Sequence, residues 1–95
     1  MKNHDRILLI EGTFKPEEAR EILASMLSAK IRFHQLKNFS SIEKNGTDDP
    51  VSKIRIPELE LSMEKVISMI ANATSNHAVL KIHSEISIEF IKSEN

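Results

Sequence analysis

The segment from Phe33 to Ser41 carries the most varied side chains of the chain: an imidazole, two amides, a lysine, two serines and two phenylalanines within nine residues. On a helix, imidazole, amide and hydroxyl groups offer a surface of hydrogen-bond donors and acceptors. Phe39 falls outside the main apolar stripe, and an exposed phenylalanine can mark a contact with a second molecule. The predicted partner-binding surface comprises His34, Gln35, Asn38, Phe39 and Ser41. The alternative is that these residues form the solvated side of a helix.

A second candidate is the stretch between Glu21 and Glu43, which contains no acidic residue. Its basic side chains could hold phosphates as point charges. The alternative function, nucleic-acid or anion binding, uses Lys30, Arg32, Lys37 and Lys44. Two observations argue against this function. These cations lie in the second half of the predicted helix, where they stabilise the negative end of its dipole. The chain also has 14 acidic residues against 13 Lys and Arg residues. We therefore expect the cations to be solvated or paired with acidic residues of the second helix, and we expect a protein partner rather than nucleic acid.

Catalytic and metal-binding chemistry has no specific pattern in this chain. The four histidines lack the spacing of a helical metal pair, and neither a His-Glu-x-x-His nor a Gly-x-Ser-x-Gly motif occurs. The two glycines are too few for a glycine-rich phosphate loop, and the chain has no cysteine for a thiolate or a disulfide. We predict no catalytic residue, no metal site and no cofactor, and hence a non-enzymatic protein.

Two segments have the pattern of β-strands. From Leu80 to Phe90 apolar residues alternate with polar ones, which predicts a long ribbon with one buried and one solvated face. The apolar run Ile7–Ile10 predicts a short strand over residues 6–11 that ends in a turn at Gly12. One short strand cannot supply all the pairing that the last strand needs. We therefore expect a second copy of the chain to complete the sheet.

Helical periodicity occupies the segment between the strands. The first stripe, with three-four spacing, consists of Ala19, Ile22, Met26, Ala29, Phe33, Leu36 and Ser40. It predicts a helix from Pro16 to about Ile42, with a cap at Asn45-Gly46. A second stripe predicts a regular helix from about Pro57 to Thr74. Residues 50–56 are expected to be less regular, because Pro57 either kinks the second helix or starts it.

The order strand, helix, helix, strand predicts one α+β domain over residues 1–95. An antiparallel helical hairpin packs on a two-stranded antiparallel ribbon, and dimerisation completes the fold. The longest run of apolar residues falls far short of a signal-peptide core or a membrane span. We therefore expect a cytoplasmic protein without a membrane partner.

The sequence also carries three strings that resemble a known group of proteins. They are Ile10-Glu11-Gly12-Thr13-Phe14, Pro16-Glu17-Glu18-Ala19 and the segment Phe33 to Ser41. Together they resemble a small bacterial family of about this length with no assigned activity, over most of the chain. The resemblance implies an intracellular bacterial protein that acts through contacts, and it brings no catalytic residues. We predict a homo-oligomeric protein-interaction module, most simply a homodimer.

Overall fold

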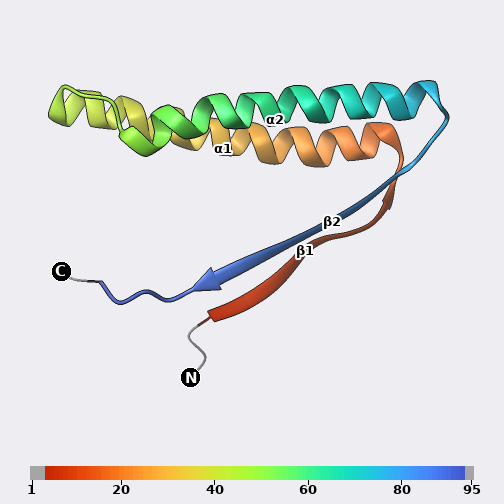
Figure 1. Ribbon diagram of the computed structural model, residues 1–95, viewed down its shortest axis with the longest axis horizontal. Coiled ribbons are helices and arrows are strands. Elements are labelled where there is room, and N and C mark those ends of the chain that lie inside the picture. The colour runs from red at the N-terminus through yellow and green to blue at the C-terminus, as the bar shows by residue number, and fades with distance from the viewer. Residues whose placement is uncertain (1–3, 94–95) are drawn as a thin grey trace.

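A helical hairpin and a two-stranded ribbon make up the fold (Figure 1). The computed structural model describes residues 4–93, and within them the order is β1 (His4–Phe14), α1 (Pro16–Asn45), α2 (Pro50–Ser75) and β2 (Leu80–Glu89). The strands pair antiparallel in one two-stranded sheet. The predicted β-α-α-β fold is therefore confirmed. Residues 1–3 and 94–95, which the predicted domain also includes, lie outside the described residues.

The ends of α1 follow from local chemistry. Pro16 occupies the first turn, where its missing N–H costs no hydrogen bond, and the Lys15 N–H donates to Glu18 Oε1 at 2.9 Å. At the other end Gly46 adopts a left-handed φ of 73°, and its N–H donates to the Ile42 carbonyl at 2.9 Å. The predicted start and cap are confirmed, and the helix runs three residues beyond the predicted end at Ile42.

The second helix begins earlier than predicted. It is helical from Pro50, so the expectation that residues 50–56 are less regular is wrong, and Pro57 lies inside the helix. Asp49 caps this start, because its Oδ2 accepts the Ser52 N–H at 2.9 Å. Ser52 is itself fully buried. Pro57 removes one backbone donor. The cap and the buried first turn hold the helix before that gap, and the buried Leu59 anchors it after the gap.

The first strand is longer than predicted. Gly12 does not end it in a turn but pairs with Ile82 inside the ribbon, and the pairing continues to Phe14 opposite Leu80. The short-strand prediction is therefore wrong, because the long β2 provides backbone partners beyond the apolar run of β1. The prediction for the last strand is confirmed to within one residue.

A β-bulge decides which side chains of β1 share a face. The register shifts between Leu8 and Ile10, so that Ile7 lies opposite Ile86 and Ile10 lies opposite Ser84. Residues three apart would face opposite sides of a regular strand. The extra residue, Leu9, restores the alternation, and both isoleucines join the apolar face of the ribbon.

The two arms of the molecule meet at one end and diverge toward the other (Figure 1). The chain spans 52 × 39 × 15 Å, and its radius of gyration is 17.1 Å. A compact domain of this length has a radius of gyration of ~12 Å. The buried apolar side chains belong to the joined end and to the hairpin interface, and they are Ile10, Ala19, Leu59, Ile70 and Ala73. Much apolar surface therefore remains outside the core.

Candidate functional site

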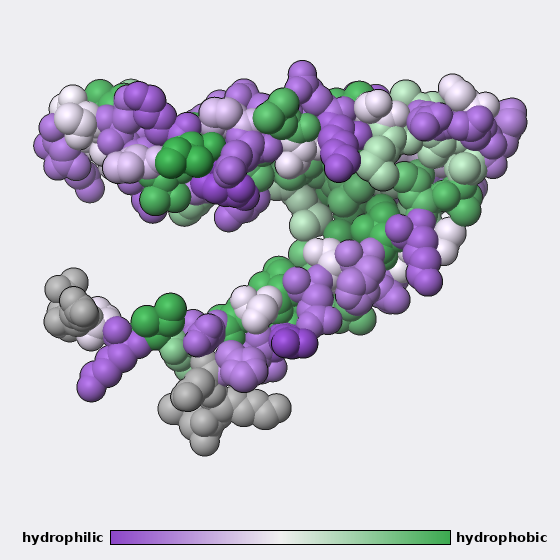
Figure 2. All heavy atoms as spheres, viewed as in Figure 1, coloured by the Kyte–Doolittle hydropathy of each residue, from purple (hydrophilic) through white to green (hydrophobic). Residues whose placement is uncertain are grey.

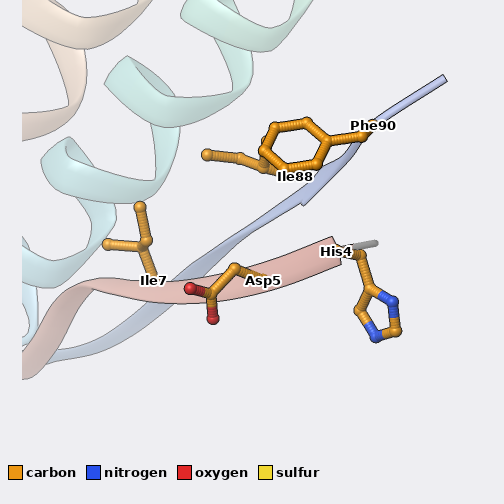
Figure 3. Close-up of a pocket in the computed structure, with 5 residues that line it drawn as sticks. All are labelled: His4, Asp5, Ile7, Ile88 and Phe90. Atoms are coloured by element: carbon orange, nitrogen blue, oxygen red, sulfur yellow. The ribbon is translucent and has the colours of Figure 1, made fainter. Parts of the chain in front are cut away.

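The ribbon presents an apolar face that its own chain leaves largely uncovered. In the part of β2 far from the joined end, Ile86 and Ile88 are 40% and 44% exposed, and Phe90 beyond the strand is 69% exposed. Ile7 lies opposite Ile86 and is about half exposed. In Figure 3 the side chains of Ile7, Ile88 and Phe90 point toward the helices, whereas His4 points away. The face that the alternation predicted is present, but only its inner half is covered.

A matching apolar stripe runs along α1. Ala19, at the joined end, is fully buried, and Ile22 is half-buried. Three-four spacing continues the same face outward to Met26, Phe33 and Leu36, all of which are exposed. Phe33 is 54% exposed. The stripe that marked the main apolar face in the sequence is therefore an open surface for most of its length.

A different set of α1 residues packs on α2. His34 is buried against Ser52, with His34 Nδ1 and Ser52 Oγ 3.0 Å apart in a hydrogen bond. Leu27 and Ile31, which precede His34 at helical spacing, are half-buried. The sequence pattern assigned Leu27 and Ile31 only to a widening of the main stripe and not to a helix interface, because the polar residues His34 and Asn38 continue their face. The buried hydrogen bond replaces the apolar contact that periodicity detects.

Together the two uncovered faces form what we call the apolar cleft. On α1 it comprises Met26, Phe33 and Leu36, and on the ribbon it comprises Ile7, Ile86, Ile88 and Phe90. Figure 2 shows hydrophobic residues gathered inside the angle between the arms, while the outer edges of the arms in this view are largely hydrophilic. At the open end of the ribbon a hollow of about 300 Å³ is lined by His4, Asp5, Ile7, Ile88 and Phe90.

The predicted partner-binding residues divide into two groups. His34 is buried, and the Ser41 hydroxyl donates to the Thr47 carbonyl at 2.8 Å. Asn38 also has partners within the chain, in the loop between the helices. Gln35 and Phe39 are exposed, and Phe39 lies roughly a third of a turn from Phe33 around the helix. That this set binds a partner stays a prediction. Within the set, only Gln35 and Phe39 are exposed and have no hydrogen-bond role within the described chain.

Asn38 ties the interhelical loop to α1. Its Nδ2 donates to Asp48 Oδ1 at 2.9 Å, and its Oδ1 accepts the Asp49 N–H at 2.6 Å. The hydrogen bond from Asn38, assisted by Lys53, lowers the pKa of the Asp48 carboxyl. The hydrogen bonds from the Ser52 side chain and backbone lower the pKa of Asp49. These groups hold the loop in place and cap α2.

The four predicted anion-binding residues do not form one cluster. Lys30, Lys37 and Lys44 follow one line along α1 at seven-residue spacing, whereas Arg32 lies on a different side. Lys30 Nζ lies 5.3 Å from the centre of the Phe33 ring. Within residues 4–93 no ion pair joins these cations to the glutamates of α2, where Glu58 instead pairs with Arg55 at 2.8 Å.

The opposite face of the ribbon is mostly polar, with the exposed Leu8 opposite Glu85 as its apolar exception. His83 Nδ1 lies 2.6 Å from Glu11 Oε2, and Arg6 Nη1 lies 3.7 Å from Glu85 Oε1.

The described part of the chain contains no group of three or more His, Asp or Glu side chains placed to hold a metal ion. In the same residues no helix is both long enough and apolar enough to cross a membrane.

Comparison of the chain with protein-family models, curated proteins and solved structures found no match.

Proposed function

We propose that the protein is a self-assembly module, and that a second copy of the chain occupies its apolar cleft to form a homodimer. The function of such a module is carried by contacts rather than by catalysis. Both faces of the cleft, one on α1 and one on the ribbon, are apolar. Each copy can therefore bury its own apolar surface against that of the other.

The excess surface of the single chain carries this proposal. A compact folded chain of 10.8 kDa exposes ~5,500 Å². This chain exposes 7798 Å², which is roughly 2,300 Å² more than that expectation. Stable homodimers bury about 1,000–2,500 Å² on each partner. The excess therefore matches the area that one copy contributes to an obligate dimer.

Two exposed phenylalanines of α1 give a matched test. Phe33 lies on the apolar cleft and is 54% exposed, whereas Phe39 lies off it and is 62% exposed. Phe33→Lys places a charge in the proposed interface, where its desolvation is costly. We expect light scattering to give a dimer mass for the parent and for Phe39→Lys, and a monomer mass for Phe33→Lys at micromolar concentration.

The outcomes separate three arrangements of the chain. A parent monomer at these concentrations would contradict the proposal and would indicate that the two arms close on each other within one chain. Loss of the dimer in Phe39→Lys but not in Phe33→Lys would move the interface to the exposed part of the predicted partner-binding surface. Circular dichroism of both variants provides the folding control.

Anion binding along α1 is the second candidate. The observation that favours it is that Lys30 and Lys44 form no ion pair among the described residues, while Lys37 acts on the Asp49 carboxylate only through its charge. Binding through these cations would weaken steeply with salt. Replacing all three with Gln would then lower the salt slope by up to about three. Failure of the parent to bind heparin at low salt would remove this candidate.

A further inference from the structure

The ribbon has two free edges, which differ in how regular their backbone is. Within the described residues the sheet contains β1 and β2 alone, so each strand has one paired edge and one free edge. Free edges carry unpaired backbone N–H and C=O groups, which proteins usually pair or cover. The outer edge of β1 is interrupted by the bulge between Leu8 and Ile10. The outer edge of β2 offers ten residues without a glycine, a proline or a bulge of its own.

We propose that β2 pairs antiparallel with β2 of a second copy, which would give a four-stranded sheet with both β2 strands at its centre. This inference rests on the self-assembly proposed above. A twofold axis perpendicular to the sheet keeps both apolar faces on one side. Both helical hairpins then cover that side, and the polar faces with Arg6, His83 and Glu85 remain in water.

The side chains of β2 favour one register, with the axis at Ser84. This register places His83 opposite Glu85 of the partner subunit and Ile82 opposite Ile86 of the partner subunit. An axis at Glu85 would instead place two glutamates directly opposite each other, and like charges in that position destabilise a sheet. Ser84 is also close to the middle of β2, so this register pairs almost the whole strand.

The same register supplies an occupant for the open end of the ribbon. With the axis at Ser84, Ile88 lies opposite Leu80 of the partner subunit. Leu80 is the first residue of β2, at the joined end of the two arms. The joined end of each copy therefore lies beside the hollow that Ile7, Ile88 and Phe90 line in the other (Figure 3). Apolar surface that one chain leaves open is covered by the second.

Cysteine cross-linking tests this register directly, because the chain has no cysteine of its own. Lys81 and Ser87 are exposed on the polar face of β2, and the register places each opposite the other in the partner. Lys81→Cys and Ser87→Cys are co-expressed and oxidised. We expect a disulfide-linked dimer from the mixture and none from either variant alone, since identical positions would lie ~20 Å apart and a disulfide needs Cα atoms within about 7 Å.

Ser84→Cys, on the axis, is expected to cross-link with itself. The matched control is Thr13→Cys, which lies opposite Lys81 on the other strand of the same chain and samples the β1 edge. Two results would overturn the proposed β2 pairing but leave the self-assembly proposal standing. One is a disulfide between two copies of Thr13→Cys, and the other is the absence of any disulfide in the mixture of Lys81→Cys and Ser87→Cys. A parent protein that is monomeric by light scattering would overturn both.

Discussion

At the scale of single residues, His34 shows how one polar contact replaces an apolar one. The hydrogen bond between His34 Nδ1 and Ser52 Oγ lies inside the hairpin interface, and both residues are buried. A buried hydroxyl that loses its partner keeps its full desolvation cost. The contact therefore fixes how α1 and α2 align, and it also fixes the first turn of α2.

His34→Ala should destabilise the fold strongly. It removes the buried hydrogen bond between His34 and Ser52 and opens a cavity, for a combined loss of about 2–4 kcal/mol in the free energy of unfolding. The neighbouring Gln35→Ala removes an exposed polar side chain and should change stability by no more than ~0.5 kcal/mol. Urea unfolding at fixed protein concentration measures both. Equal stabilities of the two variants would contradict the role assigned to His34.

The loop carboxylates make the fold acid-sensitive. The pKa of Asp48 is lowered in the folded state, chiefly by the hydrogen bond from Asn38. A lowered folded-state pKa gives stability that is present above the unfolded pKa of about 3.9 and is lost as the pH falls through the folded value. Asp48→Asn should therefore lose less stability than the parent between pH 5 and pH 2 in urea titrations. Gln35→Ala, at an exposed side chain that does not titrate, should retain the parent profile.

At the scale of elements, the end of α2 contains a residue in an unusual backbone conformation. His77 has a φ of 51°, and the Ala78 N–H donates to the Ala73 carbonyl at 2.8 Å, as in the helix terminus that glycine favours. His77→Gly should raise the free energy of unfolding by about 0.5–1 kcal/mol, because glycine adopts this φ without a Cβ clash. The control variant, His77→Ala, keeps a Cβ atom at this position and therefore should not raise the free energy of unfolding. Thermal unfolding of the three proteins provides the comparison.

The elements also show what periodicity can and cannot predict. The alternation of β2, the stripe of α1 and the cap at Gly46 are local signals, and they gave the element order, the pairing and the hairpin. The length of β1 depended on the partner strand opposite Gly12, and the helical start at Pro50 depended on the buried contact of Ser52. Both are tertiary effects that override local preference. The two apolar stripes that line the cleft were each predicted from their own segment, but the cleft itself was not, because it depends on the angle at which the arms join.

At the scale of the whole molecule, stability should depend on concentration. If the apolar cleft is filled by a second copy, folding and association are linked, and the melting temperature of the parent rises with protein concentration. Ile86→Asp puts a charge on the cleft and should abolish that rise, whereas Ser87→Asp, on the polar face, should preserve it. Calorimetry over a hundredfold range of concentration makes the comparison. A parent melting temperature that does not change would indicate a monomer.

The bulge at Leu9 has a consequence for how far assembly can proceed. A sheet whose two edges were both regular could add copies indefinitely and grow into a fibre. If the proposed β2 pairing forms, the interrupted β1 edge would stop growth after that one pairing. Deleting Leu9 would keep Ile7 and Ile10 on the same face, because they would then be two residues apart. The deletion variant should therefore fold, yet polymerise, and form sedimenting, thioflavin-positive material under conditions in which the parent stays dimeric. The single extra residue in β1 would thus limit the assembly to a dimer.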